Sequence, residues 1–272
     1  MPTYEPFDWY ETPLYYDIIF DADTDKEADF LEVVHGKHAS PCGGGDEMLH
    51  ILEPACGSGR LLADLGLRGH HVAGVDLSQG MLGFARKRLK QCKVKARLQQ
   101  APMQAFDLPA KVAPGYDLAH ILVSSFKYLQ TEGDAAACLS CICDHLRVGG
   151  VFVLGVHAAE YDDREPVLER HRARRGGVDV ICTIRTSPSD KAKRTEQMRS
   201  RIVARFDDGS PTRRYESNWA FRTYSPGQLR TLIKREPRLR HLATYTFDHD
   251  IKQRTGIDSD DLGLVLVLRR ER

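Results

Sequence analysis

Hydrophobic positions alternate regularly with polar ones through the middle of this chain. Short apolar runs, typical of buried strands, are separated by segments whose apolar residues repeat with the period of a helix. The expected strands cover 48–53, 71–77, 96–100, 116–123 and 151–156, and the expected helices cover 60–67, 80–91 and 133–146. We expect Gly149-Gly150 to end the last of these helices. Strands that alternate with helices at this spacing predict a parallel α/β sheet.

The pattern changes after His157. Charged segments rich in β-forming residues cover 178–185, 197–206 and 215–224. The segment Asp207–Pro211 has the composition of a turn between two of them. We therefore expect a small antiparallel insertion.

Both ends of the chain add further elements. Apolar periodicity predicts helices over 12–20 and 25–34, and Pro41–Gly45 then breaks the chain. Near the other end, Ser225 and Pro226 suit the N-cap and first turn of a helix that runs through Glu236. Two last strands are expected over 239–247 and 262–268.

The composition is that of a soluble globular protein. Hydrophobic residues make up 42% and charged residues 28%, and no stretch reaches the roughly 18 consecutive apolar residues of a membrane span. The first residues lack the basic start and apolar run of an export signal, so we expect a cytoplasmic protein. We expect the cysteines to be reduced. We also expect no metal site, because Cys138, Cys141 and Cys143 do not share one helix face.

The net charge of +1 conceals a separation of charge along the chain. Residues 1–40 are rich in acids, whereas 164–214 contain twelve arginines and two lysines against seven acids. In one interpretation an acidic ligand or nucleic-acid phosphates are bound by Arg170, Arg172, Arg174 and Arg175. In the other, the arginines neutralise the acidic N-terminal helices or lie on a solvated sheet face. The scarcity of aromatic residues for base stacking favours this second interpretation.

The segment ILEPACGSGRLL, residues 51–62, joins the first expected strand to the first expected helix. Gly57 and Gly59 let the backbone approach a ligand, and the helix that begins at Arg60 offers free N–H groups, which favours a nucleotide-like cofactor. No lysine follows the glycines, which excludes a P-loop. Leu62 stands where a dinucleotide fingerprint has its third glycine, so an NAD-linked dehydrogenase is a more distant alternative.

Two acidic residues narrow the cofactor further. Glu53 ends the strand before the turn, where a carboxylate attracts an ammonium group and repels a pyrophosphate. Asp76 ends the second strand, roughly twenty residues on, where an acid accepts hydrogen bonds from ribose hydroxyls. The pair indicates an adenosyl cofactor that carries an amino acid.

In these motifs the chain resembles class I S-adenosylmethionine-dependent methyltransferases of the small-molecule type, with a methyltransferase-25-like domain. The resemblance is carried by 53–60 and 75–78, and it continues through 106–109, 116–118, 146–152 and 222–226. It covers most of the chain from Met48 to Arg269. It implies an α/β fold with a Rossmann-like, seven-stranded, mostly parallel sheet, an antiparallel last strand and helices on both faces.

The resemblance also implies a division of the chain. We expect an N-terminal helical cap over 1–47 and a cofactor-binding methyltransferase core over 48–157. An antiparallel β insertion on the substrate side is expected over 158–224, and a final helix and β-hairpin of the core over 225–272. We expect the insertion to form much of the acceptor pocket.

The cofactor implied is S-adenosyl-L-methionine, with S-adenosyl-L-homocysteine as product. The resemblance assigns Glu53 to the methionine amino group, the backbone of Ala55, Gly57 and Gly59 to the methionine portion, and Asp76 to the ribose. The full set of expected cofactor residues is Glu53, Ala55, Gly57, Ser58, Gly59, Arg60, Asp76, Leu77, Met81, Met103, Gln104 and Ser124.

The adenine end departs from the family pattern. Leu77 and Met81 are expected against the adenine, but Pro102 stands where the family often has an acid that accepts the adenine amino group. We therefore expect Met103 to contact the adenine, and backbone or Gln104 to bond it.

Methyl transfer is an in-line displacement, in which positioning supplies most of the acceleration and a base is needed only for a protonated acceptor. We expect Phe126, Tyr128 and His157 on the substrate side. The segment after the fourth strand lacks the Asn/Asp-Pro-Pro-aromatic tetrad of amino-methylating DNA and protein-glutamine enzymes. The catalytic candidates are Tyr16 and His157. For His157 the competing interpretation is a solvated strand-end histidine. In one interpretation Tyr15 and Tyr16 form part of a lid over the cofactor, and in the other they pack an N-terminal helix on the sheet.

These observations predict an S-adenosylmethionine-dependent methyltransferase that transfers a methyl group to N or O of a small-molecule acceptor. We expect a monomer or homodimer that binds neither metal nor membrane. One alternative is an RNA methyltransferase that uses the arginine-rich insertion. Another is a non-catalytic S-adenosylmethionine-binding regulatory protein.

Overall fold

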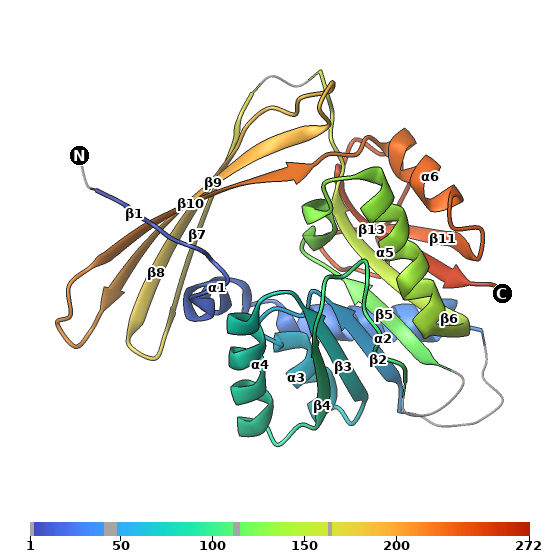
Figure 1. The fold of residues 1–272 in the computed structure, drawn as a ribbon, viewed down its shortest axis with the longest axis horizontal. Helices are drawn as coiled ribbons and strands as arrows, with labels where there is room; N and C mark the ends of the chain where they lie inside the picture. The colour runs from blue at the N-terminus through green and yellow to red at the C-terminus, as the bar shows by residue number, and fades with distance from the viewer. Residues whose placement is uncertain (1–2, 41–47, 111–114, 163–164) are drawn as a thin grey trace.

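Two sheets organise the chain, as the computed structural model shows for residues 3–40, 48–110, 115–162 and 165–272 (Figure 1). A large sheet has helices on both sides, and a smaller, mostly antiparallel sheet extends away from it. Within these ranges no helix is both long and apolar enough to cross a membrane. The predicted break at Pro41–Gly45 lies outside the described residues.

The large sheet has the strand order β12-β11-β13-β6-β5-β2-β3-β4. Its strands are β2 (His50–Pro54), β3 (His71–Asp76), β4 (Ala96–Gln100), β5 (Tyr116–Ile121), β6 (Leu146–His157), β11 (Leu239–Thr246), β12 (Arg254–Thr255) and β13 (Gly263–Arg270). Neighbours from β4 to β6 pair in parallel, whereas β13 runs antiparallel to β6 and to β11. The predicted parallel-rich sheet with an antiparallel last strand is confirmed, and the short β12 lies at its edge.

Helices bury both faces of this sheet. One face carries α5 (Glu132–His145) and α6 (Pro226–Lys234), and the other carries α2 (Thr24–His38), α3 (Arg60–Leu67) and α4 (Gln79–Gln91). The central strands are therefore continuous apolar runs, because the side chains that point to either face of the sheet are buried. Cys138 and Cys143 are fully buried in the core under α5.

The second sheet has the order β1-β10-β9-β8-β7. Its strands are β1 (Glu5–Pro6), β7 (Val167–Arg175), β8 (Val178–Thr186), β9 (Thr195–Phe206) and β10 (Arg213–Arg222). One face packs on α1 (Pro13–Phe20) through an apolar cluster that includes Ile18, Val180 and Ile202. We call the opposite face, which carries the odd-numbered side chains of β8 and β9, the outer face.

The structure adds two strands that the sequence pattern does not predict, and it corrects one predicted helix end. The strand β7 was not predicted, because it is a largely exposed edge strand whose sequence VLERHRARR lacks apolar alternation. The two-residue β1 was not predicted either. The prediction that the helix ends at Gly149-Gly150 is wrong: α5 ends at His145, and β6 begins at once. The register between β5 and β6 shifts here, and Gly149 has a φ of +80°, so the glycines form an irregularity within the strand.

Candidate cofactor-binding and active site

The turn between β2 and α3 has a left-handed backbone. Ala55, Gly57 and Gly59 have φ values of 59°, 51° and 70°, a region that favours glycine. A Cβ on Gly59 would lie 2.9 Å from the Ala85 Cβ on α4, so glycine permits the close approach. A Cβ on Gly57 would first meet the Tyr16 ring, at 3.9 Å, so the turn faces a space beneath Tyr16.

Asp76, at the end of β3, holds this turn in place. Its Oδ2 accepts a hydrogen bond from the Gly57 N–H at 2.7 Å, and its Oδ1 accepts one from the Ser78 N–H at 2.8 Å. Burial raises the pKa of this carboxyl, and the backbone hydrogen bonds act against that rise. Each carboxylate oxygen has a further lone pair, so Asp76 keeps acceptor capacity for a ligand.

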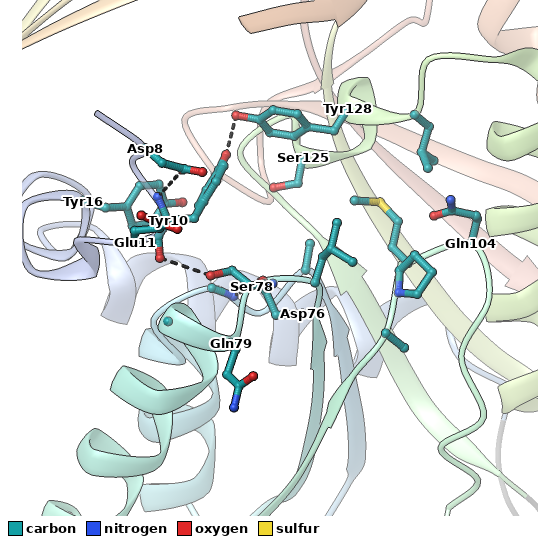
Figure 2. A pocket seen from close by; sticks show the side chains of 18 of the residues that line it. Asp8, Tyr10, Glu11, Tyr16, Asp76, Ser78, Gln79, Gln104, Ser125 and Tyr128 are labelled. Atoms are coloured by element: carbon teal, nitrogen blue, oxygen red, sulfur yellow. Dashed lines mark hydrogen bonds between the residues drawn. The ribbon is translucent and has the colours of Figure 1, made fainter. Parts of the chain in front are cut away.

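A cavity of about 680 Å³ opens beside the turn, within the size range of small-molecule sites (Figure 2). The core contributes Ala55, Gly57, Asp76, Leu77, Ser78, Gln79, Gly80, Ala101, Pro102, Met103, Gln104, Ser125, Tyr128, Leu129, Gln130 and Asp134. The N-terminal segment contributes Asp8, Tyr10, Glu11 and Tyr16. Among the described residues that line this cavity, none belongs to 158–224. The expectation that the insertion forms much of the pocket therefore does not hold for this cavity.

The insertion instead holds two walls of the cavity in place. Backbone pairing of β1 with β10 continues to Phe7, whose N–H donates to the Glu216 carbonyl at 3.1 Å, so the following Asp8–Glu11 segment is anchored to the small sheet. The Phe221 ring of β10 meets the Tyr128 ring edge-on at a centroid distance of 4.6 Å. The small sheet is thus a scaffold for the N-terminal wall and for Tyr128.

The loop after β5 has a strained backbone just before the residues that line the cavity. Val123 and Ser124 have φ values of 55° and 60°, and such strain in a β-branched residue often marks a functional site. The Ser124 Oγ lies 2.8 Å from the His157 Nδ1 and accepts the His157 N–H at 3.1 Å. The His157 ring stacks on Phe247 with centroids 4.3 Å apart. Neither Ser124 nor His157 is among the described lining residues, so the pair braces the loop that presents Ser125 and Tyr128.

Two tyrosines meet across the cavity. The Tyr10 hydroxyl donates a hydrogen bond to the Tyr128 hydroxyl (Figure 2). Burial raises the pKa of Tyr10 and of Tyr128 well above the ordinary value, and it raises the pKa of Tyr16 to about 12. All three are therefore neutral hydroxyls at physiological pH, suited to hydrogen bonding rather than to proton abstraction.

A buried polar pair lies beneath the turn. The Glu53 Oε1 is 3.9 Å from the His120 Nδ1. Within the described part of the chain, the Glu53 Oε2 and both His120 ring nitrogens have no hydrogen-bond partner. Burial raises the pKa of Glu53 well above its usual range and lowers that of His120 to about 3. A buried acceptor without a partner is costly, and an ammonium group that reached Glu53 would satisfy it.

The remaining predicted cofactor residues are divided. Leu77, Met103 and Gln104 line the cavity beside Pro102, whereas Met81 is fully buried. Ser58 is also buried and outside the described lining.

Three further predicted residues face elsewhere. Arg60 turns toward α2, where its Nη2 lies 2.6 Å from the Glu27 Oε2. Phe126 is fully buried in the core and does not line the cavity, which corrects its placement on the substrate side. Tyr15 packs in the cluster under the small sheet.

Four residues that make this cavity acidic and aromatic could not be predicted from the sequence alone. Asp8, Tyr10 and Glu11 line the cavity because the two-residue strand β1 anchors the segment just before them. Asp134 lines it from the first turn of α5. The dense aromatic and acidic run FDWYE at 7–11 is the signal that could have drawn attention to the N-terminal wall. Its position depends on a pairing with β10, more than 200 residues away, which no local pattern reveals.

The arginines of the insertion bind acids of the protein itself in several places. Arg175 pairs with both Asp17 and Asp21 of the N-terminal region, and Arg88 of α4 joins the same cluster. The interpretation that the insertion neutralises the acidic N-terminal helices is confirmed for Arg175. Other acids there pair with arginines of the core, such as Glu27 with Arg60.

The sequence of the core matches a known family. Residues 51–150 match the family described as Methyltransferase domain. The dTDP-3-amino-3,4,6-trideoxy-alpha-D-glucopyranose N,N-dimethyltransferase of Streptomyces venezuelae is 34% identical over 108 residues, 40% of this chain and 42% of that protein. The matches to such curated relatives span about two fifths of their length.

Solved structures resemble the whole chain. A S-adenosylmethionine-dependent methyltransferase from Clostridium acetobutylicum ATCC 824 matches with a TM-score of 0.74 at 18% identity, over 97% of this chain and 99% of that chain. The sugar N-methyltransferase KedS8 from Streptoalloteichus sp ATCC 53650 matches with a TM-score of 0.71 at 19% identity, over 100% of this chain and 96% of that chain. These likenesses show the fold.

The matched segment and the fold agree: residues 51–150 match a methyltransferase domain, and the large sheet has the fold of solved S-adenosylmethionine-dependent methyltransferases. S-adenosylmethionine is the cofactor of this class, and the residues present fit it. The open glycine turn accommodates a ligand, Asp76 lies beside it, and Glu53 offers an unpartnered buried oxygen within the described structure.

Proposed function

We propose that this protein is a methyltransferase that transfers the methyl group of S-adenosylmethionine to the amine nitrogen of a small molecule. The charge of the cavity carries the proposal. Asp8, Glu11, Asp76 and Asp134 line it, and no lysine, arginine or histidine is among the described lining residues. Carboxylates concentrated in one cavity attract cations, here a sulfonium-bearing donor and a protonated amine.

The likeness to two N-methyltransferases supports the choice of nitrogen. The names of the Streptomyces venezuelae relative and of KedS8 describe N-methylation of an amino sugar and of a sugar. An amino-bearing small molecule would fit the same acid-lined cavity here.

The donor would be held by the residues around the glycine turn. Bound S-adenosylmethionine supplies an electrophilic methyl group on a sulfonium. Glu53 would bind its ammonium, the backbone of Ala55 and Gly57 its methionine portion, and Asp76 its ribose. Leu77 and Met103 would contact the adenine, because both line the same cavity.

The acceptor would be held by the opposite wall. The Tyr10 and Tyr128 hydroxyls, bonded to each other, are placed to orient an amine by hydrogen bonds. A protonated amine must lose a proton before it attacks, and Asp8 offers a carboxylate in the same cavity. The Asp8 Oδ1 accepts the Tyr10 N–H at 2.8 Å, which orients this carboxylate beside the tyrosine.

The test is turnover with matched acceptors. Purified protein and S-adenosylmethionine are incubated with amino sugars and with the same sugars carrying a hydroxyl in place of the amine, and S-adenosylhomocysteine formation is measured. We expect product from the amines. Turnover of the alcohols alone would contradict the choice of nitrogen, and binding of the cofactor without any turnover would favour the regulatory alternative.

A pair of variants tests the role of Asp8. We expect Asp8→Asn to lower kcat/KM for the amine at least tenfold while the affinity for S-adenosylhomocysteine stays within twofold, because Asp8 belongs to the N-terminal wall and not to the glycine turn. Glu11→Gln is the matched control, an exposed carboxylate of the same cavity. Equal losses in both variants would contradict a specific role for Asp8 as a base. They would indicate that the total negative charge of the cavity matters instead.

The RNA alternative makes a different prediction. Activity that requires an RNA acceptor, and that falls steeply with salt, would contradict the small-molecule proposal.

A further inference from the structure

The outer face of the small sheet is strongly basic. Side chains alternate across its strands, and those that face away from the α1 cluster include Arg170, Arg172, Arg174, Arg185, Arg199, Arg201, Arg205 and Arg214. The strands that carry them, β7 to β10, extend away from the large sheet on the left of Figure 1. The proposed methyl transfer uses none of these side chains.

Several of these arginines are neutralised by neighbouring acids. The Arg172 Nε lies 2.9 Å from the Asp179 Oδ1, and the Arg205 Nη1 lies 3.8 Å from the Asp179 Oδ2. The Arg201 Nε lies 2.7 Å from a Glu216 oxygen. These pairs agree with the interpretation of a solvated, internally compensated sheet face.

Arg185 and Arg199 differ from that pattern. They are directly opposite each other on β8 and β9, and neither guanidinium group forms a hydrogen bond or an ion pair with a described residue. Arg199 does act on Glu216, but the pKa of that carboxyl is lowered chiefly by its hydrogen bond from Arg201 and less by Arg199. Like charges directly opposite in an antiparallel pair are destabilising, so an anion bound between them would relieve the repulsion.

The two guanidinium groups also line a cavity. It has a volume of about 370 Å³, and its other lining residues are Pro166, Ser187, Pro188, Gln197, Met198 and Asn218. No aspartate or glutamate is among the described residues that line it, and it shares none of them with the cofactor cavity. The site therefore combines two planar cations and two side-chain amides with an apolar edge.

We propose that this cavity binds the phosphate or diphosphate group of a small organic molecule between Arg185 and Arg199. Guanidinium groups bind phosphate through paired N–H donors, and two of them match a dianion. Gln197 and Asn218 would donate further hydrogen bonds, and Pro166 and Met198 would contact the organic part. The proposal does not depend on methyl transfer, since its ligand needs no donor.

The test uses pyrophosphate and inorganic phosphate as probes, by calorimetry at constant ionic strength and without S-adenosylmethionine. We expect saturable binding, tighter for pyrophosphate, and a loss of at least tenfold in Arg185→Gln and in Arg199→Gln. The matched control is Arg170→Gln, which removes the same charge from the same face but outside the cavity, and which should change affinity less than twofold.

A thermal measurement separates binding from folding. Without anion, Arg185→Gln and Arg199→Gln should melt no lower than the parent, because each relieves repulsion between opposed cations. Pyrophosphate should then raise the melting temperature of the parent but not of either variant. Absence of saturable binding, or equal weakening in all three variants, would overturn the proposal. So would binding confined to an RNA oligonucleotide and weakened by Arg170→Gln, which would indicate a nucleic-acid surface.

Discussion

Two carboxylate–guanidinium pairs of nearly equal length lie in opposite surroundings. The Arg60 Nη2 is 2.6 Å from the Glu27 Oε2 between α3 and α2, where both side chains are 8% exposed. The Arg174 Nη2 is 2.5 Å from the Asp207 Oδ2 at the small sheet, where the side chains are 63% and 53% exposed. Water screens the second pair and not the first, so burial rather than distance decides what each contributes.

The core and the small sheet also differ in the sign of the charges that they expose. The cofactor cavity is lined by carboxylates, and the outer face of the small sheet carries guanidinium groups. A chain with a net charge of +1 can therefore offer one site to cations and another to anions. Four changes, ordered by the size of the expected effect, test how far this difference between the regions extends.

The largest effect on stability is expected from the buried pair of Glu27 and Arg60. Glu27→Gln leaves the Arg60 guanidinium buried without its counter-charge, which should lower the free energy of unfolding by about 3 to 5 kcal/mol. Urea unfolding at pH 7 measures this. A loss below about 1 kcal/mol, the scale of an exposed pair, would mean that water reaches Arg60.

The next effect depends on pH. Burial lowers the pKa of His120 to about 3, while a histidine in an unfolded chain titrates near 6.5. Between these values the unfolded chain binds more protons, so acidification from pH 7 to pH 4 should cost about 3 kcal/mol of stability through this residue. In His120→Gln that share of the pH dependence should vanish. Urea unfolding at both pH values compares the two proteins, and an unchanged pH dependence would show that His120 is not buried as a neutral ring.

A smaller effect is expected on ligand binding. Asp76→Ala removes an acceptor for the ribose and for the Gly57 N–H, which should weaken S-adenosylhomocysteine binding by about 1.5 to 3 kcal/mol. Calorimetry measures the affinity, with Glu11→Gln from the same cavity as the control that should bind normally. Normal binding by Asp76→Ala would place the ribose elsewhere.

The smallest effect belongs to the exposed pair. Arg174→Gln should change the free energy of unfolding by less than about 1 kcal/mol, and high salt should reduce even that. The same urea experiment at low and high salt checks it. A loss as large as that of Glu27→Gln would remove the distinction between the two regions.

Much of the fold could be predicted from local pattern. The alternation of strands and helices between Met48 and Val156 follows from burial on both faces of a parallel sheet, and the turn at Asp207–Pro211 lies between β9 and β10. The Ser225 cap also formed: its Oγ accepts the Gln228 N–H, and the Gln228 side chain accepts the Ser225 N–H. β7 could not be predicted, because an exposed edge strand has no buried face to impose a period.

The candidate site could be predicted only in part. The glycine turn, Glu53 and Asp76 are close in sequence or at a fixed strand-to-strand spacing, so their meeting follows from the motif. Tyr10 and Tyr128 are 118 residues apart, and their hydroxyls meet only because β10 holds the N-terminal segment on one side and Phe221 supports Tyr128 on the other. Long-range packing of this kind leaves no periodic trace.

The kind of cofactor could be predicted from local sequence, because the residues that distinguish an adenosyl cofactor from a dinucleotide or a triphosphate lie within one strand-turn-helix unit and the next strand. The tertiary structure decided which charges face a ligand. The order of charges along the chain does not specify which charges pair. Arg175 forms ion pairs with Asp17 and Asp21, whereas Arg185 and Arg199 lie opposite each other without an ion pair to any described acid. Electrostatic energy depends on burial and distance in space, and only the folded chain fixes both.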